Sequence, residues 1–322
     1  MKFGYYPGCS LERNARSYHD STMAIADRLD LEFDEVEDWN CCGATEYFAL
    51  NKIPAYALVS RNLALAAKQQ NGSHDLVAPC SACYINLLKT DHSLAESAEL
   101  RDKVDQALEA GGLSYEPGTL KVKHLLETIV KDIGYEAVEE QVEKPLYNLR
   151  VAPYYGCMVP RPSSMESFDD PEHPMTMDTL FEKLGAIVID FPLKAQCCGG
   201  HMTQISEETA LEMIRRLLKN ADDYDADMIA TICPMCQLNL DAYQDAVNAH
   251  FGTDFQIPVV YFTQLIGLAF GIPAKELGFG SEMVSAKPAL AKVSEEPPKK
   301  SKKRRRVKRN TGLPMPGMPE EG

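Results

Sequence analysis

Ten cysteines are the residues of this chain whose type and spacing point most directly to chemistry. They form two sets of five, which are Cys9, Cys41, Cys42, Cys80 and Cys83, and then Cys157, Cys197, Cys198, Cys233 and Cys236. Each set contains a single cysteine, an adjacent pair and a Cys-x-x-Cys motif in the same order. Thiolate-only sites select soft metals, which are zinc, copper(I) and the iron of iron–sulfur clusters. The cysteines therefore indicate two metal or redox sites of one kind.

The residues that flank the cysteines repeat as well. Tyr5-Tyr6-Pro7-Gly8-Cys9 resembles Tyr154-Tyr155-Gly156-Cys157, and Cys41-Cys42-Gly43 resembles Cys197-Cys198-Gly199. Corresponding cysteines lie 148 to 156 residues apart in the 322-residue chain. A period of that length is too long for a solenoid repeat and fits a duplicated domain.

The number and spacing of the thiols narrow the kind of metal site. A structural zinc ion takes four ligands, so each set holds one thiolate more than zinc needs. Two adjacent cysteines leave the backbone in different directions, which suits a cluster with several metal corners. The Cys-x-x-Cys-x-x-Cys run of ferredoxin cubanes is absent. We therefore expect a non-standard iron–sulfur cluster in each half, with a non-catalytic zinc-binding scaffold as the alternative.

Apolar patterning predicts an α/β fold for both halves, with short strands and flanking helices. Expected strands cover Lys2–Tyr6, Leu31–Val36, Leu76–Ala78, Arg150–Pro153, Ala186–Asp190 and Met228–Ile232, and expected helices cover Asn14–Leu29, 54–70, Met175–Leu184 and Ser206–Ala221. Cysteines follow the ends of these strands, which is where ligands bind in open α/β sheets. Two further helices, Ser93–Ala110 and Lys121–Ile133, are expected to bridge the halves.

Charge separates the body of the chain from its end. The whole chain carries a net charge of −14, whereas residues 287–322 contain 11 basic and 4 acidic residues, which leaves −21 for the remainder. An acidic body argues against nucleic-acid binding. We expect a disordered basic tail over residues 281–322, with nine basic residues between Lys299 and Arg309. No signal peptide or bilayer-length apolar stretch is visible, so we expect a cytoplasmic protein without direct membrane insertion.

The doubled ten-cysteine pattern resembles the cysteine-rich CCG domains of the B subunits of heterodisulfide reductases. The resemblance extends over about residues 1–272 and includes the segments around each cysteine, such as Asn40–Glu46 and Gln196–Met202. It implies a first CCG domain over residues 1–145, a second over 146–280 and no counterpart for the tail. It also implies one noncubane [4Fe-4S] cluster in each domain. Cys9, Cys41, Cys42, Cys80 and Cys83 would ligate the first cluster, and Cys157, Cys197, Cys198, Cys233 and Cys236 the second.

The family's activity gives the expected function. It is an oxidoreductase of anaerobic metabolism that acts on a sulfur group, reducing a disulfide of the coenzyme M–coenzyme B type or an analogue to two thiols. Each cluster would supply one electron. With every cysteine committed, this chain has no cubane relay of its own, so electrons would arrive from a partner. The resemblance implies two partners in a heterodisulfide reductase-like complex, which are a ferredoxin-like C subunit and a flavin-containing A subunit.

An alternative function within the same family is electron transfer without disulfide cleavage. CCG subunits also serve dehydrogenases of hydroxyacids or glycerol 3-phosphate and quinone-linked dehydrogenases. The Cys-Cys-Gly-Ala-Thr-Glu and Cys-Cys-Gly-Gly-His-Met contexts favour the heterodisulfide branch.

Two residues near the cysteines could act on a substrate. His201 follows Cys197-Cys198-Gly199-Gly200 directly, and it would either donate a proton to a departing thiolate, bond a cluster sulfide, or pack beside the loop. Arg161 would either bind an anionic substrate group or be an ordinary surface or structural arginine. Gly8, Gly43, Gly156, Gly199 and Gly200 would allow the backbone to approach a cluster closely.

Overall fold

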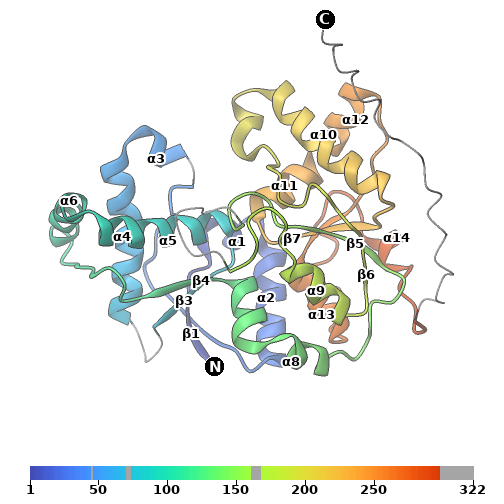
Figure 1. Ribbon diagram of the computed structural model, residues 1–322, viewed down its shortest axis with the longest axis horizontal. Helices are drawn as coiled ribbons and strands as arrows, with labels where there is room; N and C mark the ends of the chain where they lie inside the picture. The colour runs from blue at the N-terminus through green and yellow to red at the C-terminus, as the bar shows by residue number, and fades with distance from the viewer. Residues whose placement is uncertain (45, 70–73, 161–167, 298–322) are drawn as a thin grey trace, which may run out of the picture.

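The computed structural model describes residues 1–44, 46–69, 74–160 and 168–297. Two parallel four-stranded sheets organise this part of the chain (Figure 1). The first has the order β2-β1-β3-β4 and the second the order β6-β5-β7-β8, so both halves repeat one topology. The strands are β1 (Lys2–Tyr5), β2 (Glu32–Glu35), β3 (Asp75–Ala78), β4 (Lys121–His124), β5 (Arg150–Tyr154), β6 (Ile187–Val188), β7 (Met228–Thr231) and β8 (Val259–Tyr261). The predicted α/β class and the duplication are confirmed.

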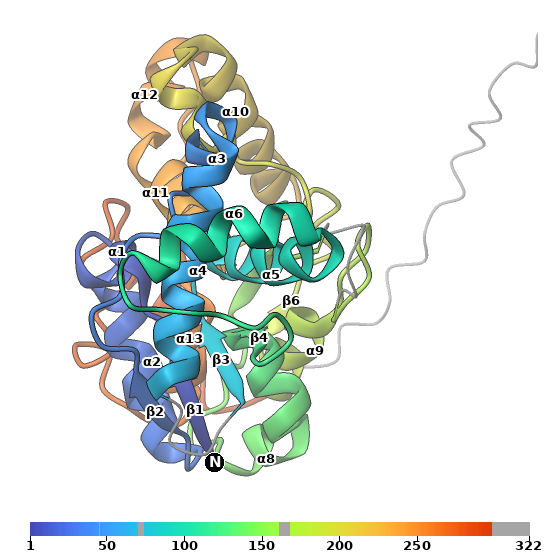
Figure 2. The same cartoon turned by 90° about the vertical axis from the view of Figure 1, so that its left-hand side faces the viewer.

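Helices cover the sheets and connect the strands, as Figures 1 and 2 show from two directions. The first half contains α1 (Gly8–Glu12), α2 (Arg16–Arg28), α3 (Glu46–Leu50), α4 (Lys52–Gln69), α5 (Ser81–Glu96), α6 (Ala98–Glu109), α7 (Leu125–Glu127), the π-helical turn η1 (Thr128–Ile133) and α8 (Tyr135–Glu140). The second half contains α9 (Thr176–Lys183), the 3₁₀ turn η2 (Gly200–Gln204), α10 (Glu207–Asp223), α11 (Pro234–Ala242), α12 (Gln244–Phe251), α13 (Phe262–Ala269) and α14 (Lys287–Leu290).

The strands β3, β5 and β7 form where short apolar runs are buried on both faces, as is typical of parallel sheets. All four residues of β7 are buried, and so are the last three of β3. The helix α10 shows the complementary pattern, because its buried residues recur every three or four positions along one face. Its buried residues are Ala210, Leu211, Ile214, Leu217, Leu218 and Ala221.

The two halves meet through α2 and α13. The ring of Tyr18 on α2 stacks on Tyr261, with centroids 4.3 Å apart and planes 7° from parallel. Further along α2, Ser21 Oγ and Thr263 Oγ1 are 2.7 Å apart and share a hydrogen bond. Side chains of both halves belong to one continuous apolar core.

The segment 93–110 does not bridge the halves as expected, whereas the segment 121–133 begins as strand β4, continues as helix and contacts the second half, with Lys131 Nζ 5.7 Å from the ring centroid of Phe168. The expected helix over 93–110 is interrupted at Ser97, which caps the N-terminus of α6, and α6 packs on α4 within the first half. Residues 121–124 form β4 beside β3 because Lys123, buried at this position, is neutralised by Asp75 and Asp132. The apolar residues that follow do form helical segments, α7 and η1, so the predicted helix is wrong only over the four residues of β4.

The expected start of the disordered tail at residue 281 is also wrong. Residues 281–297 include α14, whose Ala289 is buried, and Ser294 forms a β-bridge with Tyr147. Lys292 pairs with Asp227 on the second half. Small apolar residues give this segment enough buried contact to remain packed. The basic run 299–309 lies outside the described residues, and the division expected between residues 145 and 146 falls between α8 and β5.

None of the helices in the described part of the chain combines the length and apolar character needed to cross a membrane.

Candidate functional site

One cavity of about 430 Å³ brings all ten cysteines together. It lies beyond the carboxyl ends of the central strands of both sheets, where the chain order reverses between β1 and β3 and between β5 and β7. Its wall contains Cys9, Cys41, Cys42, Cys80, Cys83, Cys157, Cys197, Cys198, Cys233 and Cys236, and it also contains His201. The sequence predicts two sites, and the fold places them on one shared space.

In the first half, three segments carry the five thiols. Cys9 lies on α1, the adjacent pair follows β2, and Cys80 is the residue that caps the N-terminus of α5. The Sγ atoms of Cys9 and Cys41 are 3.6 Å apart, and those of Cys42 and Cys83 are 3.5 Å apart. Cys9 and Cys41 are exposed, whereas the other three are buried.

The second half repeats this arrangement with less exposure. Cys233 caps the N-terminus of α11, and Cys236 lies in its first turn. Cys157 and Cys197 are half-buried, and the other three are buried. Helices α5 and α11 therefore both begin at cysteines, where the helix dipole stabilises negative charge.

A tyrosine anchors the adjacent cysteine pair in each half. The hydroxyl of Tyr6 donates to the carbonyl of Asn40, 2.6 Å away, which directly precedes Cys41. The hydroxyl of Tyr154 donates to the carbonyl of Gln196, 2.8 Å away, which directly precedes Cys197. The two tyrosines are equivalent in the duplication, because each stands three residues before the first cysteine of its half.

An asparagine in each half performs a second anchoring role that the cysteine pattern alone does not reveal. Asn86 Nδ2 donates to the carbonyls of Cys42 and Ala44, at 3.1 and 2.6 Å. Asn239 Nδ2 donates to the carbonyls of Cys198 and Gly200, at 3.3 and 2.8 Å. The signal was present in the sequence, because each Cys-x-x-Cys motif extends to Cys-x-x-Cys-x-x-Asn.

Two glycines permit the close packing of sulfur against the backbone. A Cβ atom on Gly8 would lie 2.6 Å from Cys83 Sγ, and one on Gly156 would lie 2.9 Å from Cys236 Sγ. Both glycines also have positive φ angles, of 73° and 69°. Glycine is therefore required at both positions for space and for backbone conformation.

The crowding of thiols has an electrostatic consequence. Hydrogen bonds with neighbouring cysteines, together with burial, raise the pKa of Cys83 and of Cys236 well above the ordinary value. A hydrogen bond with Cys41 and burial raise the pKa of Cys42 to about 12. Thiolates packed this closely need compensating positive charge if all of them are to be ionised, and bound metal cations supply such charge. The donor set and its crowding fit a thiolate-ligated metal cluster.

Side chains suited to a single ion are not gathered in this way. Among the residues that the structure describes, no three His, Cys, Asp or Glu side chains converge tightly enough to hold one metal ion. The cysteines are instead spread around the cavity wall.

The cavity has one apolar side. Met158, Met202, Met235 and Ile205 of the second half line it, and Ile205 is 75% exposed at its edge. At positions equivalent to Met158 and Met235, counted from the cysteines, the first half has Ser10 and Ala82. The described part of the lining contains no Lys, Arg, Asp or Glu. Arg161 lies outside the described residues.

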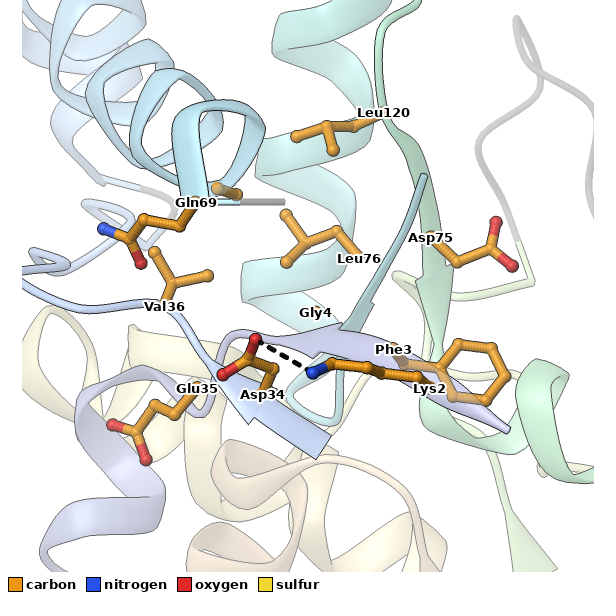
Figure 3. A pocket seen from close by; sticks show the side chains of 11 residues that line it. Lys2, Phe3, Gly4, Asp34, Glu35, Val36, Gln69, Asp75, Leu76 and Leu120 are labelled. Atoms are coloured by element: carbon orange, nitrogen blue, oxygen red, sulfur yellow. Dashed lines mark ion pairs between the residues drawn. The ribbon is translucent and has the colours of Figure 1, made fainter. Parts of the chain in front are cut away.

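A smaller hollow elsewhere differs in every respect. It holds about 30 Å³ on the first sheet and is lined by residues of β1, β2 and β3, with no cysteine. Figure 3 shows the ion pair of Lys2 and Asp34 at this hollow, with Nζ and Oδ2 3.7 Å apart. A space of this size holds about one water molecule.

Comparison with known proteins agrees with the duplicated site. Residues 3–88 and 151–241 each match the CCG cysteine-rich domain family. The chain is 34% identical over 285 residues to the membrane anchor subunit of the 8-methylmenaquinol:fumarate reductase of Wolinella succinogenes, covering 88% of this chain and 98% of that protein. It is 31% identical over 297 residues to the B subunit of the ferredoxin:CoB-CoM heterodisulfide reductase of Methanosarcina mazei, covering 91% and 97%.

A solved structure supports the fold. The crystal structure of a hypothetical protein from Helicobacter pylori superposes with a TM-score of 0.69 at 16% identity, covering 88% of this chain and about half, 52%, of that chain. The repeated topology, the two family matches and the full-length relatives agree. This chain belongs to the CCG cysteine-rich domain family of iron–sulfur oxidoreductase subunits and is related to the B subunits of heterodisulfide reductases.

Proposed function

We propose that this chain is the catalytic iron–sulfur subunit of a heterodisulfide reductase-like complex. Two noncubane [4Fe-4S] clusters, each held by the five cysteines of its own half, would face one substrate. The observation that carries this proposal is the single cavity lined by all ten cysteines. A plain electron relay needs two clusters near each other, whereas a substrate site needs open space between them.

The proposed reaction is R–S–S–R′ + 2 e⁻ + 2 H⁺ → RSH + R′SH. When bound, the clusters supply one electron each, taken from a ferredoxin-like partner that a flavin-containing partner reduces. The chain itself holds the disulfide between its halves and shields it from bulk water on the apolar side of the cavity. His201 lines this cavity and would hand a proton to a product thiolate.

Anaerobic purification with iron and sulfide analysis tests whether the chain binds two iron–sulfur clusters. We expect about eight iron and eight labile sulfide per chain, the content that two [4Fe-4S] clusters require. About one zinc per half with no labile sulfide would instead establish the zinc scaffold. Cys41→Ser and Cys198→Ser should each disrupt only the cluster of its own half.

Electron paramagnetic resonance of the oxidised protein then tests the substrate site. A candidate thiol that binds at a cluster should produce a new paramagnetic signal. For His201, the variant His201→Gln should keep the iron content and lower the rate of disulfide reduction. An unchanged rate would leave His201 with a packing role only.

The apolar side of the cavity favours a second candidate function, which is quinone-linked electron transfer. A quinone ring is neutral and apolar, and it accepts two electrons and two protons as a disulfide does. The described lining offers it methionines and no charged side chain. The relative from Wolinella succinogenes is named for a reductase that uses 8-methylmenaquinol.

Substitutions that copy the first half onto the second separate these candidates. Met158→Ser and Met235→Ala remove apolar surface from the cavity wall and leave all ten cysteines in place. If a quinone is the substrate, the double variant should weaken the binding of a water-soluble naphthoquinone by about tenfold, because burial of apolar surface contributes roughly 25 cal/mol per Å². A small disulfide that contacts only the clusters should be affected little.

A further inference from the structure

The carbonyl groups that directly precede two of the cysteines meet where the halves join. Pro79 precedes Cys80, and Ile232 precedes Cys233. The hydroxyl of Tyr18 lies 3.0 Å from the Pro79 carbonyl oxygen and 3.4 Å from that of Ile232. One buried hydroxyl group therefore contacts the backbone next to a cysteine of each half.

A second hydroxyl reinforces the same contact from the first half. Ser81 Oγ donates to the Ile232 carbonyl oxygen, 3.3 Å away. Ser81 is 1% exposed, and it follows Cys80 directly at the start of α5. The equivalent position in the second half is Pro234, which has no side-chain donor. A side chain of the first half therefore donates to the backbone of the second half, and no equivalent bond returns from Pro234.

Packing holds these hydroxyls in place. Tyr18 is fully buried, and its ring is fixed by the stack on Tyr261. His124, which caps α7 by accepting from the Leu126 amide through Nδ1, is also fully buried and lies beside the carbonyls of Pro79 and Ile232. We call Tyr18, Ser81 and the two carbonyls the junction.

We propose that Tyr18 and Ser81 are positioning residues that fix the separation of the two cluster sites and couple their reduction potentials. The inference rests on the proposed function, because it assumes a cluster in each half. A short bonded route between them runs from Cys80 through the Pro79 carbonyl, the Tyr18 hydroxyl and the Ile232 carbonyl to Cys233. Hydrogen bonds beside cluster ligands tune cluster potentials, so a shared hydrogen-bonded unit makes each site sensitive to the charge of the other.

Two conservative variants test the junction. Tyr18→Phe removes the hydroxyl and retains the ring that stacks on Tyr261, and Ser81→Ala removes the other hydroxyl. Ser21→Ala is the control, because it removes a buried hydrogen bond between α2 and α13 and a contact with the Tyr18 carbonyl, while the Tyr18 hydroxyl and both cysteine segments stay unchanged. All three are compared with the unchanged protein, purified anaerobically with its clusters.

The measurements are the magnetic interaction between the paramagnetic clusters and the two midpoint potentials in a spectroscopic redox titration. We expect Tyr18→Phe and Ser81→Ala to weaken the interaction and shift the separation of the potentials, with their iron content retained. Ser21→Ala should match the unchanged protein. Identical spectra and potentials in all variants would overturn the inference, as would an equal change in Ser21→Ala.

Cluster content distinguishes the two possible failures. Absence of iron from the unchanged protein would refute the proposed function and the junction together. Clusters that are present but indifferent to both variants would refute the junction alone. If Tyr18→Phe fails to fold, Ser81→Ala carries the test, because it deletes one small hydroxyl at a position where the duplicated half has none.

Discussion

Replacing Gly8 with alanine should remove the metal centre of the first half and leave that of the second. The added Cβ would lie 2.6 Å from Cys83 Sγ. Non-bonded heavy atoms settle at about 3.5–4.0 Å, so the sulfur has to move by roughly 1 Å. Metal–thiolate distances tolerate only about 0.2 Å. Gly8→Ala is therefore incompatible with Cys83 as a ligand in its present position.

Backbone strain has to be separated from this steric effect. An alanine with positive φ costs about 1–2 kcal/mol wherever it is placed. Gly112 has a φ of 67°, close to the 73° of Gly8, and an added Cβ there meets nothing within 4 Å. Gly112→Ala therefore carries the strain alone. Gly156→Ala is the counterpart for the second half, with its Cβ 2.9 Å from Cys236 Sγ.

Iron and labile sulfide per folded chain, with the paramagnetic signals of each cluster, provide the assay. We expect about half the iron in Gly8→Ala and in Gly156→Ala, with opposite clusters retained, and full iron in Gly112→Ala. A Gly8→Ala variant that keeps all its iron with unchanged signals would show that the added Cβ does not displace the Cys83 sulfur. Equal iron loss in Gly8→Ala and Gly112→Ala would attribute the loss to backbone strain alone.

Three further predictions concern the residues that support the site. Tyr6→Phe and Tyr154→Phe each remove the hydroxyl that donates to the carbonyl before the paired cysteines, a hydrogen bond worth about 1 kcal/mol. Each should speed chelator-driven iron loss only from the cluster of its own half, and equal rates for both clusters would contradict this. Asn86→Ala leaves two carbonyls of the Cys-Cys-Gly loop without their donor and should lower the free energy of unfolding by about 1–3 kcal/mol, measured by urea denaturation. Burial lowers the pKa of His124 from 6.5 to about 3. As pH falls, the unfolded chain therefore binds this proton before the folded chain does. The contribution of His124 to the free energy of unfolding is fully present above pH 6.5 and falls by at most about 1.4 kcal/mol per pH unit as pH decreases toward 3. His124→Asn should flatten this decline between pH 7 and 5, and equal slopes would refute the assignment.

The fold was predictable where local pattern and tertiary packing agree. Strands β3, β5 and β7 are short apolar runs buried largely on both faces, and runs of this kind indicate a parallel sheet without knowledge of the rest of the chain. Strand β4 was not, because its two lysines precede a run with helical spacing. Lys123 is buried only because Asp75 on β3 and Asp132 beyond the next turn neutralise it. The pairing of β4 with β3 is not contained in any local window.

The candidate site also has features that the sequence predicts and features that depend on tertiary packing. Repeated spacing was enough to group the cysteines into two sets, and the asparagine that follows each Cys-x-x-Cys motif was visible in the sequence without a sign of its role. The shared cavity was not predictable from spacing. It depends on the packing of α2 against α13, which brings the Cys80 and Cys233 segments together at Tyr18.

Comparison of the two halves distinguishes residues that hold the metal centres from residues that select the substrate. Features present in both halves surround the cysteines: a tyrosine and an asparagine that anchor the paired cysteines, and a glycine against a sulfur. Features present in one half line the open space or cross the junction, as Met158, Met235 and Ser81 do where the other half has serine, alanine and proline. Two equal sites need the same ligands, but a substrate lying between them meets two different walls. The symmetric residues should therefore govern metal content, and the asymmetric ones should govern which acceptor binds and how the two electrons are shared.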